Sequence, residues 1–151
     1  MKKLLKWVGI VFAGLLVLGI VIDATESPEQ RATEAAAMAN AEREAMESLP
    51  LFTASEIARA YDANTVAADQ QFKGKRFKVT GTVDNINTDF MGNPYLTLRG
   101  GVNQFMEPQF AFNENQSEQL ASVKPGEKVT LVCVGRGDVA KTPMSGDCVM
   151  M

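Results

Sequence analysis

The sequence contains no histidine among its 151 residues. This absence excludes Ser-His-Asp and Cys-His catalysis, and it removes the usual zinc ligand and the side chain that titrates near neutral pH. General acid–base chemistry would depend on carboxylates, lysine or tyrosine, and no clustered pair of carboxylates suggests such a site. We therefore predict that the protein is not an enzyme and that it has no catalytic residue, no cofactor and no metal site.

Positive charge is also scarce beyond the first residues. Residues 23–52 carry a net charge of −5, and residues 53–151 carry a net charge of −1. Nucleic-acid-binding domains usually present a basic surface, because contacts with phosphates dominate their affinity. A nucleic-acid partner is therefore not favoured, although the charge alone does not exclude it.

Long hydrophobic runs are limited to one, at the amino terminus. Lys6 is the one charged residue in the run from Leu4 to Ile22, which includes Trp7. As a helix this run would span about 28 Å, close to the thickness of the hydrocarbon core of a bilayer. Because lysines crowd the amino end, the positive-inside rule keeps that end in the cytoplasm. We predict a membrane anchor over residues 1–22, with everything from Asp23 onward across the membrane.

A cleaved signal peptide is the alternative to this anchor. Cleavage after Ala24 would place Ile22 where a small residue is preferred, and the apolar run is long for a signal peptide. The run also has no cysteine near its end, which excludes bacterial lipid attachment. We therefore favour an uncleaved anchor.

Residues 23–52 are predicted to form a helical stalk. Ser27, Pro28 and Glu29 are typical of a helix start. The segment that follows, through Ser48, is rich in Ala, Glu and Arg and contains no helix breaker. Its apolar stripe is thin, so the helix can bury little area. We favour a solvated stalk that holds the next domain away from the bilayer over a helix that pairs with a partner.

The remaining residues, 53–151, are predicted to form one small domain. Capping signals, period-2 alternation and turn residues predict the order of its helices and strands. A helix over Thr53–Asp62, with another turn or two over Asn64–Asp69, is followed by strands over Phe77–Val83, Tyr95–Arg99 and Gln109–Phe112. A helix over Glu114–Ser122 and strands over Lys128–Val134 and Asp147–Met151 complete the domain. Three strands, a helix and two strands is the order of the five-stranded OB barrel. We therefore predict a mainly β fold, an OB-fold barrel (β-β-β-α-β-β) preceded by a short helix.

Local signals refine this prediction. Thr53 and Glu56 have the spacing of a capping box at the start of the first helix, and Asn113 is expected to cap the second. Gly81 in mid-strand predicts a sharp bend or a bulge, as small barrels require. The glycines and the proline of residues 135–146 predict a flexible connection before the last strand.

Several stretches of the domain match those of a known family. They are Tyr61 and Asn64 with Ala67-Ala68, the run Phe72–Val83, the segment Leu120–Val129, and Cys133 with Asp147-Cys148. In these the chain resembles the tRNA_anti-like family, over roughly residues 55–151. The resemblance implies a bacterial OB-fold domain anchored to a membrane or by a lipid. The family name refers to the anticodon-binding domains of synthetases, and that analogy of fold implies no tRNA role.

Cysteine is nearly absent, and the two that occur, Cys133 and Cys148, allow three interpretations. They form a disulfide, or remain two buried thiols, or make half of a metal site. Without histidine a metal would need carboxylates, and no such cluster is evident. Disulfides persist outside the cytoplasm, and facing residues of the antiparallel fourth and fifth barrel strands lie within disulfide range. We favour a structural disulfide.

OB folds bind ligands on the face of the second and third strands and in the adjoining loops. On that face Tyr95 and Arg99 are expected to point outward, with Arg76 and Lys78 on the adjoining strand. We select these four residues as the candidate ligand-binding patch. A plain solvated surface is the alternative interpretation.

Aromatic residues could also offer stacking platforms to a ligand on this face. We instead expect Phe110 and Phe112 to lie in the core, because they occupy alternate positions of the predicted strand, and we expect Phe90 and Phe105 to pin their loops. Tyr95 is then the aromatic residue left for a ligand.

Together these features predict a single-pass protein of the bacterial inner membrane, with its carboxyl-terminal domain in the periplasm or at the cell exterior. We expect a non-catalytic binding module whose partner is an envelope protein, a peptide or a glycan. One alternative is the binding of single-stranded nucleic acid at the envelope, in uptake or phage exclusion. Another is a structural accessory subunit that acts through its membrane helix.

Reporter enzymes fused after Met151 test this topology. Because the anchor is expected to place the carboxyl end outside the cytosol, a fused alkaline phosphatase should be active in intact cells. A fluorescent protein that matures only in the cytosol should stay dark at the same position. The reverse pattern would contradict the predicted topology.

Overall fold

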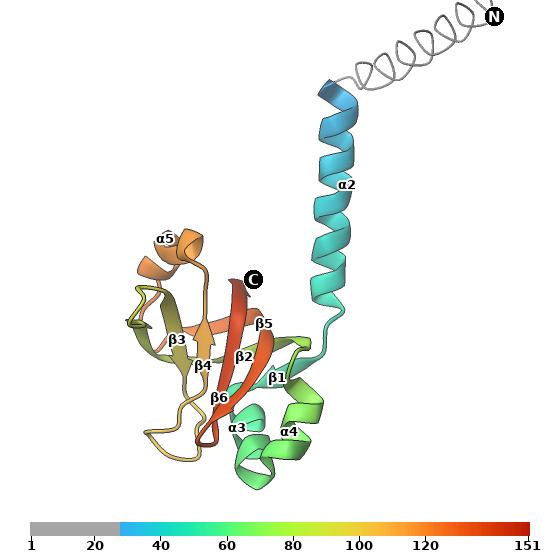
Figure 1. Ribbon diagram of the computed structural model, residues 1–151. Coiled ribbons are helices and arrows are strands. Elements are labelled where there is room, and N and C mark those ends of the chain that lie inside the picture. Colours follow the sequence, from blue (N-terminus) through green and yellow to red (C-terminus); the bar gives the residue numbers. More distant parts are fainter. Residues whose placement is uncertain (1–27) are drawn as a thin grey trace, which may run out of the picture. The chain divides into compact units, whose positions relative to one another are not determined.

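A computed structural model describes residues 28–151 (Figure 1). The chain divides into two units between Ala45 and Met46, and each is described by itself. None of the helices within residues 28–151 is both long enough and apolar enough to cross a membrane. The predicted anchor over Leu4–Ile22 and the predicted helix start at Ser27 lie outside the described residues.

The first described element is α2, a helix of 20 residues over Pro28–Glu47. Pro28 occupies its first position, where the missing N–H of proline costs no hydrogen bond. No residue of α2 is buried, as its thin apolar content leads one to expect. The predicted helix is therefore present, and its role as a stalk stays a prediction.

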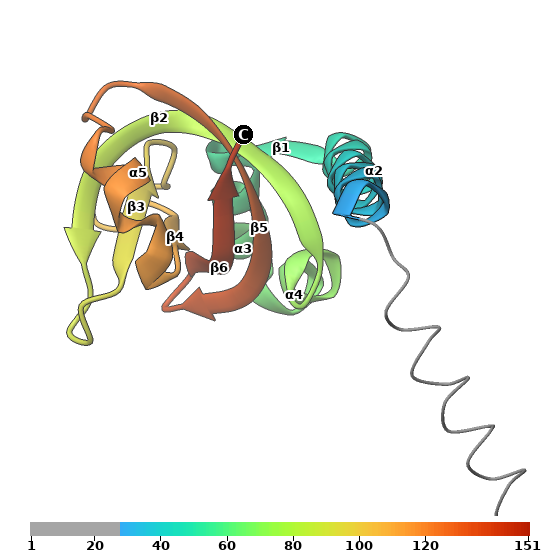
Figure 2. The ribbon, with the colours of Figure 1, turned by 90° about the horizontal axis from the view of Figure 1, so that it is seen from above.

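Residues 46–151 form a barrel with helices at its ends. Its elements are β1 (Leu51–Thr53), α3 (Ala54–Ala63), α4 (Thr65–Phe72), β2 (Arg76–Thr88), β3 (Pro94–Leu98), β4 (Gln109–Ala111), the 3-10 turn η1 (Glu114–Gln116), α5 (Ser117–Ala121), β5 (Lys128–Val139) and β6 (Thr142–Met150). Strands β2, β3, β4, β6 and β5 follow one another around the barrel, which closes where β2 pairs with β5 (Figure 2). The pairings among these five strands are antiparallel except that of β4 with β6. This topology is the OB fold, and it confirms the predicted fold class.

The core is built from alternate residues of the barrel strands and from the helices that cover the barrel ends. Helices α3 and α4 lie at one end and α5 at the other (Figure 1). Ile57 and Tyr61 of α3 and Leu120 of α5 are buried in this core, and Phe110 and Phe112 are buried as expected. Side chains from β2 to β6 complete it: Phe77, Val79, Val83, Leu96, Leu98, Val129, Leu131, Cys133 and Cys148.

Gly81 lies where β2 passes from one neighbour to the next. The first half of β2 pairs with β5 and the second half with β3. A Cβ atom at Gly81 would lie 3.2 Å from Cβ of Leu98 and 3.3 Å from Cβ of Ala54. A side chain at this position would therefore push β3 and α3 away from the bend. The predicted bulge lies three residues further on, where the register of β2 against β3 shifts at Asp84.

The start of α3 agrees with its sequence signal. The hydroxyl of Thr53 accepts a hydrogen bond from the main-chain N–H of Glu56 at 3.2 Å, and the carboxylate of Glu56 accepts one from the N–H of Thr53 at 2.7 Å. These reciprocal bonds confirm the capping box. The hydrogen bonds that the Glu56 carboxylate accepts, first from the main-chain N–H of Thr53 and then from its hydroxyl, also hold the pKa of Glu56 below its ordinary value.

Two short elements differ from the prediction. The sequence does not indicate β1, because three residues are too few to show alternation, yet β1 pairs in parallel with β2. The helix predicted over Glu114–Ser122 is η1 followed by a single five-residue helix, α5. The side chain of Asn113 makes no capping hydrogen bond, so that prediction is wrong. Only Leu120 of α5 is buried, which leaves little packing energy to extend the helix.

The largest difference is the hairpin of β5 and β6. The sequence predicts a flexible connection over residues 135–146, yet β5 continues to Val139 and β6 begins at Thr142. The turn residues Ala140 and Lys141 have φ angles of 49° and 68°, and turns of this kind usually contain asparagine or glycine. The sequence therefore lacks the asparagine or glycine that usually indicates a hairpin turn at this point. Asp138 supports the turn by accepting a hydrogen bond from the N–H of Lys141 at 2.7 Å.

A disulfide joins Cys133 of β5 to Cys148 of β6. Their Cα atoms are 4.2 Å apart, and both residues are buried in the core. Of the three interpretations drawn from the sequence, the structure contains the favoured one. The bond closes a loop with a sequence separation of 15 residues and fixes the last strand of the barrel to its neighbour.

Replacement of both cysteines tests the contribution of this bond. The double variant Cys133→Ala/Cys148→Ala should lose about 3 kcal/mol of unfolding free energy, because the loop is no longer closed in the unfolded chain. Urea denaturation of the oxidised wild type and the variant measures the difference. A reducing agent should destabilise the wild type and leave the variant unchanged. Two alkylatable thiols in native wild type before reduction would contradict the disulfide.

Candidate functional site

A groove crosses the outer face of the barrel over β3, β4 and β6. Tyr95 and Gln109 point outward there, because they alternate with the core residues Leu96 and Phe110. The loop between β2 and β3 forms one wall. This part of the groove has a volume of about 350 Å³ and is lined by Thr88, Asp89, Phe90, Asn93, Tyr95, Gln109, Ala111, Met144 and Ser145.

A second hollow continues the first along β6. It also has a volume of about 350 Å³ and shares with the first Asp89, Asn93, Ala111, Met144 and Ser145. It adds Phe112, Asn113, Arg136, Gly146 and Asp147. The two hollows together are called the β3–β6 groove below.

The wall of the groove is a loop organised around one carboxylate. Asp89 Oδ1 accepts hydrogen bonds from the main-chain N–H groups of Met91 at 2.8 Å and Asn93 at 2.9 Å. Asp89 Oδ2 accepts a third bond, from the side-chain amide of Asn93 at 3.1 Å. These bonds, above all those from Asn93, hold the pKa of Asp89 below its ordinary value. The loop is therefore ordered before any ligand arrives.

Phe90 stands on this ordered loop with 98% of its surface exposed. The expectation that Phe90 and Phe105 pin their loops is therefore wrong, since Phe105 is 84% exposed as well. Asp89, not Phe90, holds the first loop. In the second, the side-chain oxygen of Asn103 accepts a hydrogen bond from the N–H of Phe105 at 2.9 Å. Phe90 differs from Phe105 in lining the β3–β6 groove.

Two bulges in the β5–β6 hairpin add two further charged residues, Arg136 and Asp147, to the groove. The register shifts between Val132 and Val134, where β6 has one residue more than β5. It shifts again between Gly135 and Gly137, where β5 has the additional residue. The first bulge contains Asp147, with a φ of 50°, and the second contains Arg136, followed by Gly137 with a φ of 94°. Bulges redirect side chains in this way next to binding sites.

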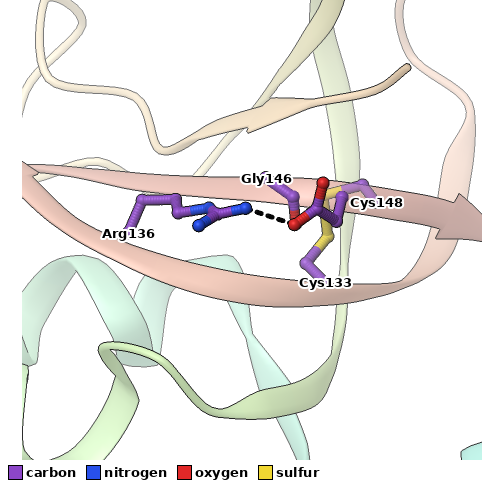
Figure 3. The surroundings of a disulfide bond; sticks show 5 residues. Cys133, Arg136, Gly146 and Cys148 are labelled. Atoms are coloured by element: carbon purple, nitrogen blue, oxygen red, sulfur yellow. Dashed lines mark hydrogen bonds and ion pairs between the residues drawn. A yellow bond between two sulfur atoms is a disulfide. The ribbon is translucent and has the colours of Figure 1, made fainter.

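The residues of the two bulges meet across the strands. The guanidinium of Arg136 forms an ion pair with the carboxylate of Asp147, drawn as the dashed line next to the disulfide in Figure 3. Both side chains are about half exposed. A Cβ atom at Gly146 would lie 3.0 Å from Nε of Arg136, so the arginine side chain lies close against the main chain of β6. The disulfide holds the same stretch of β6 from the core side.

The structure does not bring the four predicted ligand residues together. Tyr95 lies in the β3–β6 groove. Arg76 and Lys78 lie in the half of β2 that pairs with β5, away from the half that pairs with β3. Lys78 donates a hydrogen bond to the main-chain carbonyl of Glu47. Arg99 forms an ion pair with Asp84 at 3.4 Å.

Most residues of the groove are not among the ligand residues predicted from the sequence. Asp89 and Asn93 had a readable signal, because an aspartate followed by glycine and asparagine is typical of an Asx-stabilised loop. Arg136 and Asp147 had none, because their position depends on two register shifts. Within residues 28–151 no group of three or more Cys, Asp or Glu side chains is placed to hold a metal ion.

The closed five-stranded barrel is an OB-fold domain, and the groove over β3, β4 and β6 lies on the face where OB folds bind ligands. The sequence profile of the tRNA_anti-like family matches residues 1–149. The chain belongs to the tRNA_anti-like family, as the resemblance indicates.

Solved structures share this fold. One is the crystal structure of a lipoprotein from Klebsiella pneumoniae subsp. pneumoniae, for which nucleic-acid binding has been suggested. It superposes with a TM-score of 0.60 at 18% sequence identity, over 72% of this chain and 96% of the lipoprotein chain. At this identity the likeness shows the fold. No curated protein matches the sequence.

The loop at Asp89 gives a prediction about pH. A carboxylate with a lowered pKa in the folded state contributes stability above its unfolded pKa and loses it as the pH falls through the folded value. The Asp89 loop should therefore stay ordered at neutral and mildly acidic pH and loosen only below the ordinary pKa of aspartate. Amide hydrogen exchange at Met91 and Asn93 measures this change.

Substitutions at the same position separate the hydrogen bonds from the charge. Asp89→Ala removes both acceptors, so exchange at Met91 and Asn93 should become fast at neutral pH. Asp89→Asn keeps one acceptor oxygen, and exchange at the two amides should stay slower than in Asp89→Ala. Equal protection in wild type and Asp89→Ala would show that Asp89 does not order the loop.

Proposed function

We propose that the protein is a non-catalytic module of the bacterial envelope that binds a glycan strand in the β3–β6 groove. The observation that carries this proposal is the chemistry of the lining. An exposed phenyl ring, Phe90, and a partly exposed phenol, Tyr95, stand among neutral amide and hydroxyl side chains such as Asn93 and Gln109. Aromatic faces and neutral hydrogen-bonding groups suit sugar rings, and OB folds bind oligosaccharides on this face.

The pairing of the strands argues against a peptide as the ligand. Peptides often bind by adding a strand to an open sheet edge. Here β3 pairs with β2 and β4, β4 with β3 and β6, and β6 with β4 and β5. β3 and β4 are therefore paired on both sides, and recognition over them depends on side chains.

The envelope location in this proposal rests on two features. The hydrophobic run at the amino terminus is suited to anchoring the chain with its domain outside the cytosol. A buried disulfide suits the same compartment. The likeness in fold to a lipoprotein agrees with this location.

Single-stranded nucleic acid is the second candidate ligand. The role suggested for the Klebsiella lipoprotein favours it, and exposed aromatic rings stack on bases. The charge of the groove opposes it, because Arg136 is the one basic side chain among the lining residues, whereas Asp89 and Asp147 are acidic. Binding of an oligonucleotide that strengthens steeply at low salt would favour this candidate over a glycan.

Titration with a neutral oligosaccharide tests the proposal. The hexamer of N-acetylglucosamine should bind the full-length protein in detergent micelles, and Phe90→Ala and Tyr95→Ala should each weaken binding about tenfold, because a stacked ring contributes about 1.4 kcal/mol or more. Isothermal titration calorimetry measures the affinities. Phe105→Ala is the matched control, since it removes an equally prominent ring outside the groove. Equal losses in all three variants, or none, would refute the assignment of the groove.

A further inference from the structure

The β3–β6 groove contains one basic side chain, and its placement is unusual. Arg136 is the additional residue of a bulge in β5, and Asp147 belongs to a second bulge in β6. A regular hairpin would place neither side chain here, because each shift of register changes the position of the residues that follow. The two bulges together bring a guanidinium to the outer face and set a carboxylate against it.

The guanidinium keeps unused hydrogen-bonding capacity. Arginine has five N–H donors, and within residues 28–151 Arg136 has one ion-pair partner, Asp147. The Arg136 side chain is 56% exposed and borders the hollow that contains Asn93, Met144 and Ser145. Donors that do not point at Asp147 can therefore reach a group bound in the groove.

The neighbouring acids, Asp89 and Asp147, restrict which kind of anionic group Arg136 can bind in the groove. Asp89 uses both carboxylate oxygens for its own loop, and Asp147 is paired with Arg136. Both nevertheless place negative charge in the groove, which repels a doubly charged phosphate more than a singly charged carboxylate. A carboxylate also matches the planar fork of a guanidinium.

We propose that Arg136 binds the carboxylate groups of an acidic glycan, with Asp147 holding the guanidinium in position. This inference rests on the proposed function and deepens it, because it names a carboxylated sugar polymer as the ligand. Gly146 contributes by leaving space for the arginine side chain beside the main chain of β6. Phe90 and Tyr95 bind the sugar rings, and Arg136 selects the charged ones.

Two probes of equal length test this selection. The hexamer of galacturonic acid carries a carboxylate on each ring, and the hexamer of N-acetylglucosamine carries none. The full-length protein in detergent micelles should bind the acidic hexamer at least tenfold more tightly at physiological ionic strength, because hydrogen bonds to charged groups are stronger than those between neutral groups and salt screens the repulsion from the two acids of the groove. In Arg136→Gln this ratio of affinities should fall to about one.

Further variants separate recognition from structure. Arg136→Lys keeps a cation for Asp147 but loses the fork, so the ratio should fall to an intermediate value. Lys73→Gln is the matched control, because it also removes a half-exposed cation paired with an acid, Asp69, but one that does not line the groove. Its ratio should equal that of the wild type. The side-chain Nε–H resonance of Arg136 should shift when the acidic hexamer is added and stay in place with the neutral one.

The outcomes distinguish this inference from the function on which it rests. Equal affinity of the wild type for both hexamers would overturn the role of Arg136 and leave the glycan-binding function standing. The same holds if Arg136→Gln weakens both hexamers alike, since the residue would then support the hairpin only. If neither hexamer binds, the proposed function fails and the inference fails with it.

Discussion

The pairing of β6 with β5 is the contact on which the barrel and its groove both depend. β6 pairs with β5 along most of its length but meets β4 through two parallel pairs, Gln109 with Met144 and Phe110 with Ser145. So short a contact gives little stability by itself. The disulfide from Cys133 to Cys148 fixes β6 to β5 and thereby keeps β6 within reach of β4. The floor of the groove, which β3, β4 and β6 form, therefore depends on the disulfide and on the pairing of β6 with β5.

The same hairpin carries the irregularities that make the groove chemically distinctive. Each bulge takes main-chain groups out of the ladder, and the positive φ of Asp147 costs free energy. Two constraints hold the strands in place against this cost. The disulfide lies beside Asp147, and Gly135 approaches α4 so closely that a Cβ would lie 2.3 Å from the carbonyl oxygen of Phe72. Local strain that is stabilised by its surroundings is typical of binding sites.

The sequence predicts the barrel better than the groove, for physical reasons. The capping box at Thr53 and the alternation of Phe77, Val79 and Val83 are local patterns, and the order of elements follows from them. Arg76 and Tyr95 belong to one predicted patch because alternation predicts which face of a strand a residue occupies. Alternation does not predict where along the bent 13-residue strand β2 a residue such as Arg76 lies. The register shifts in β5 and β6 depend on contacts between strands, which no local pattern encodes.

The charges that line the groove determine which interactions can contribute to the binding of a ligand there. Asp89 and Asp147 line the groove with one guanidinium, that of Arg136, so the groove presents a small net negative charge to a ligand. Long-range electrostatics therefore do not attract an acidic glycan, and the binding we propose depends on stacking on Phe90 and Tyr95 and on a few hydrogen bonds. Contacts of this kind give modest affinity for each site. A polymer that repeats the same unit beside a protein held at a membrane, as we predict for this one, offsets this, because its high effective concentration favours rebinding.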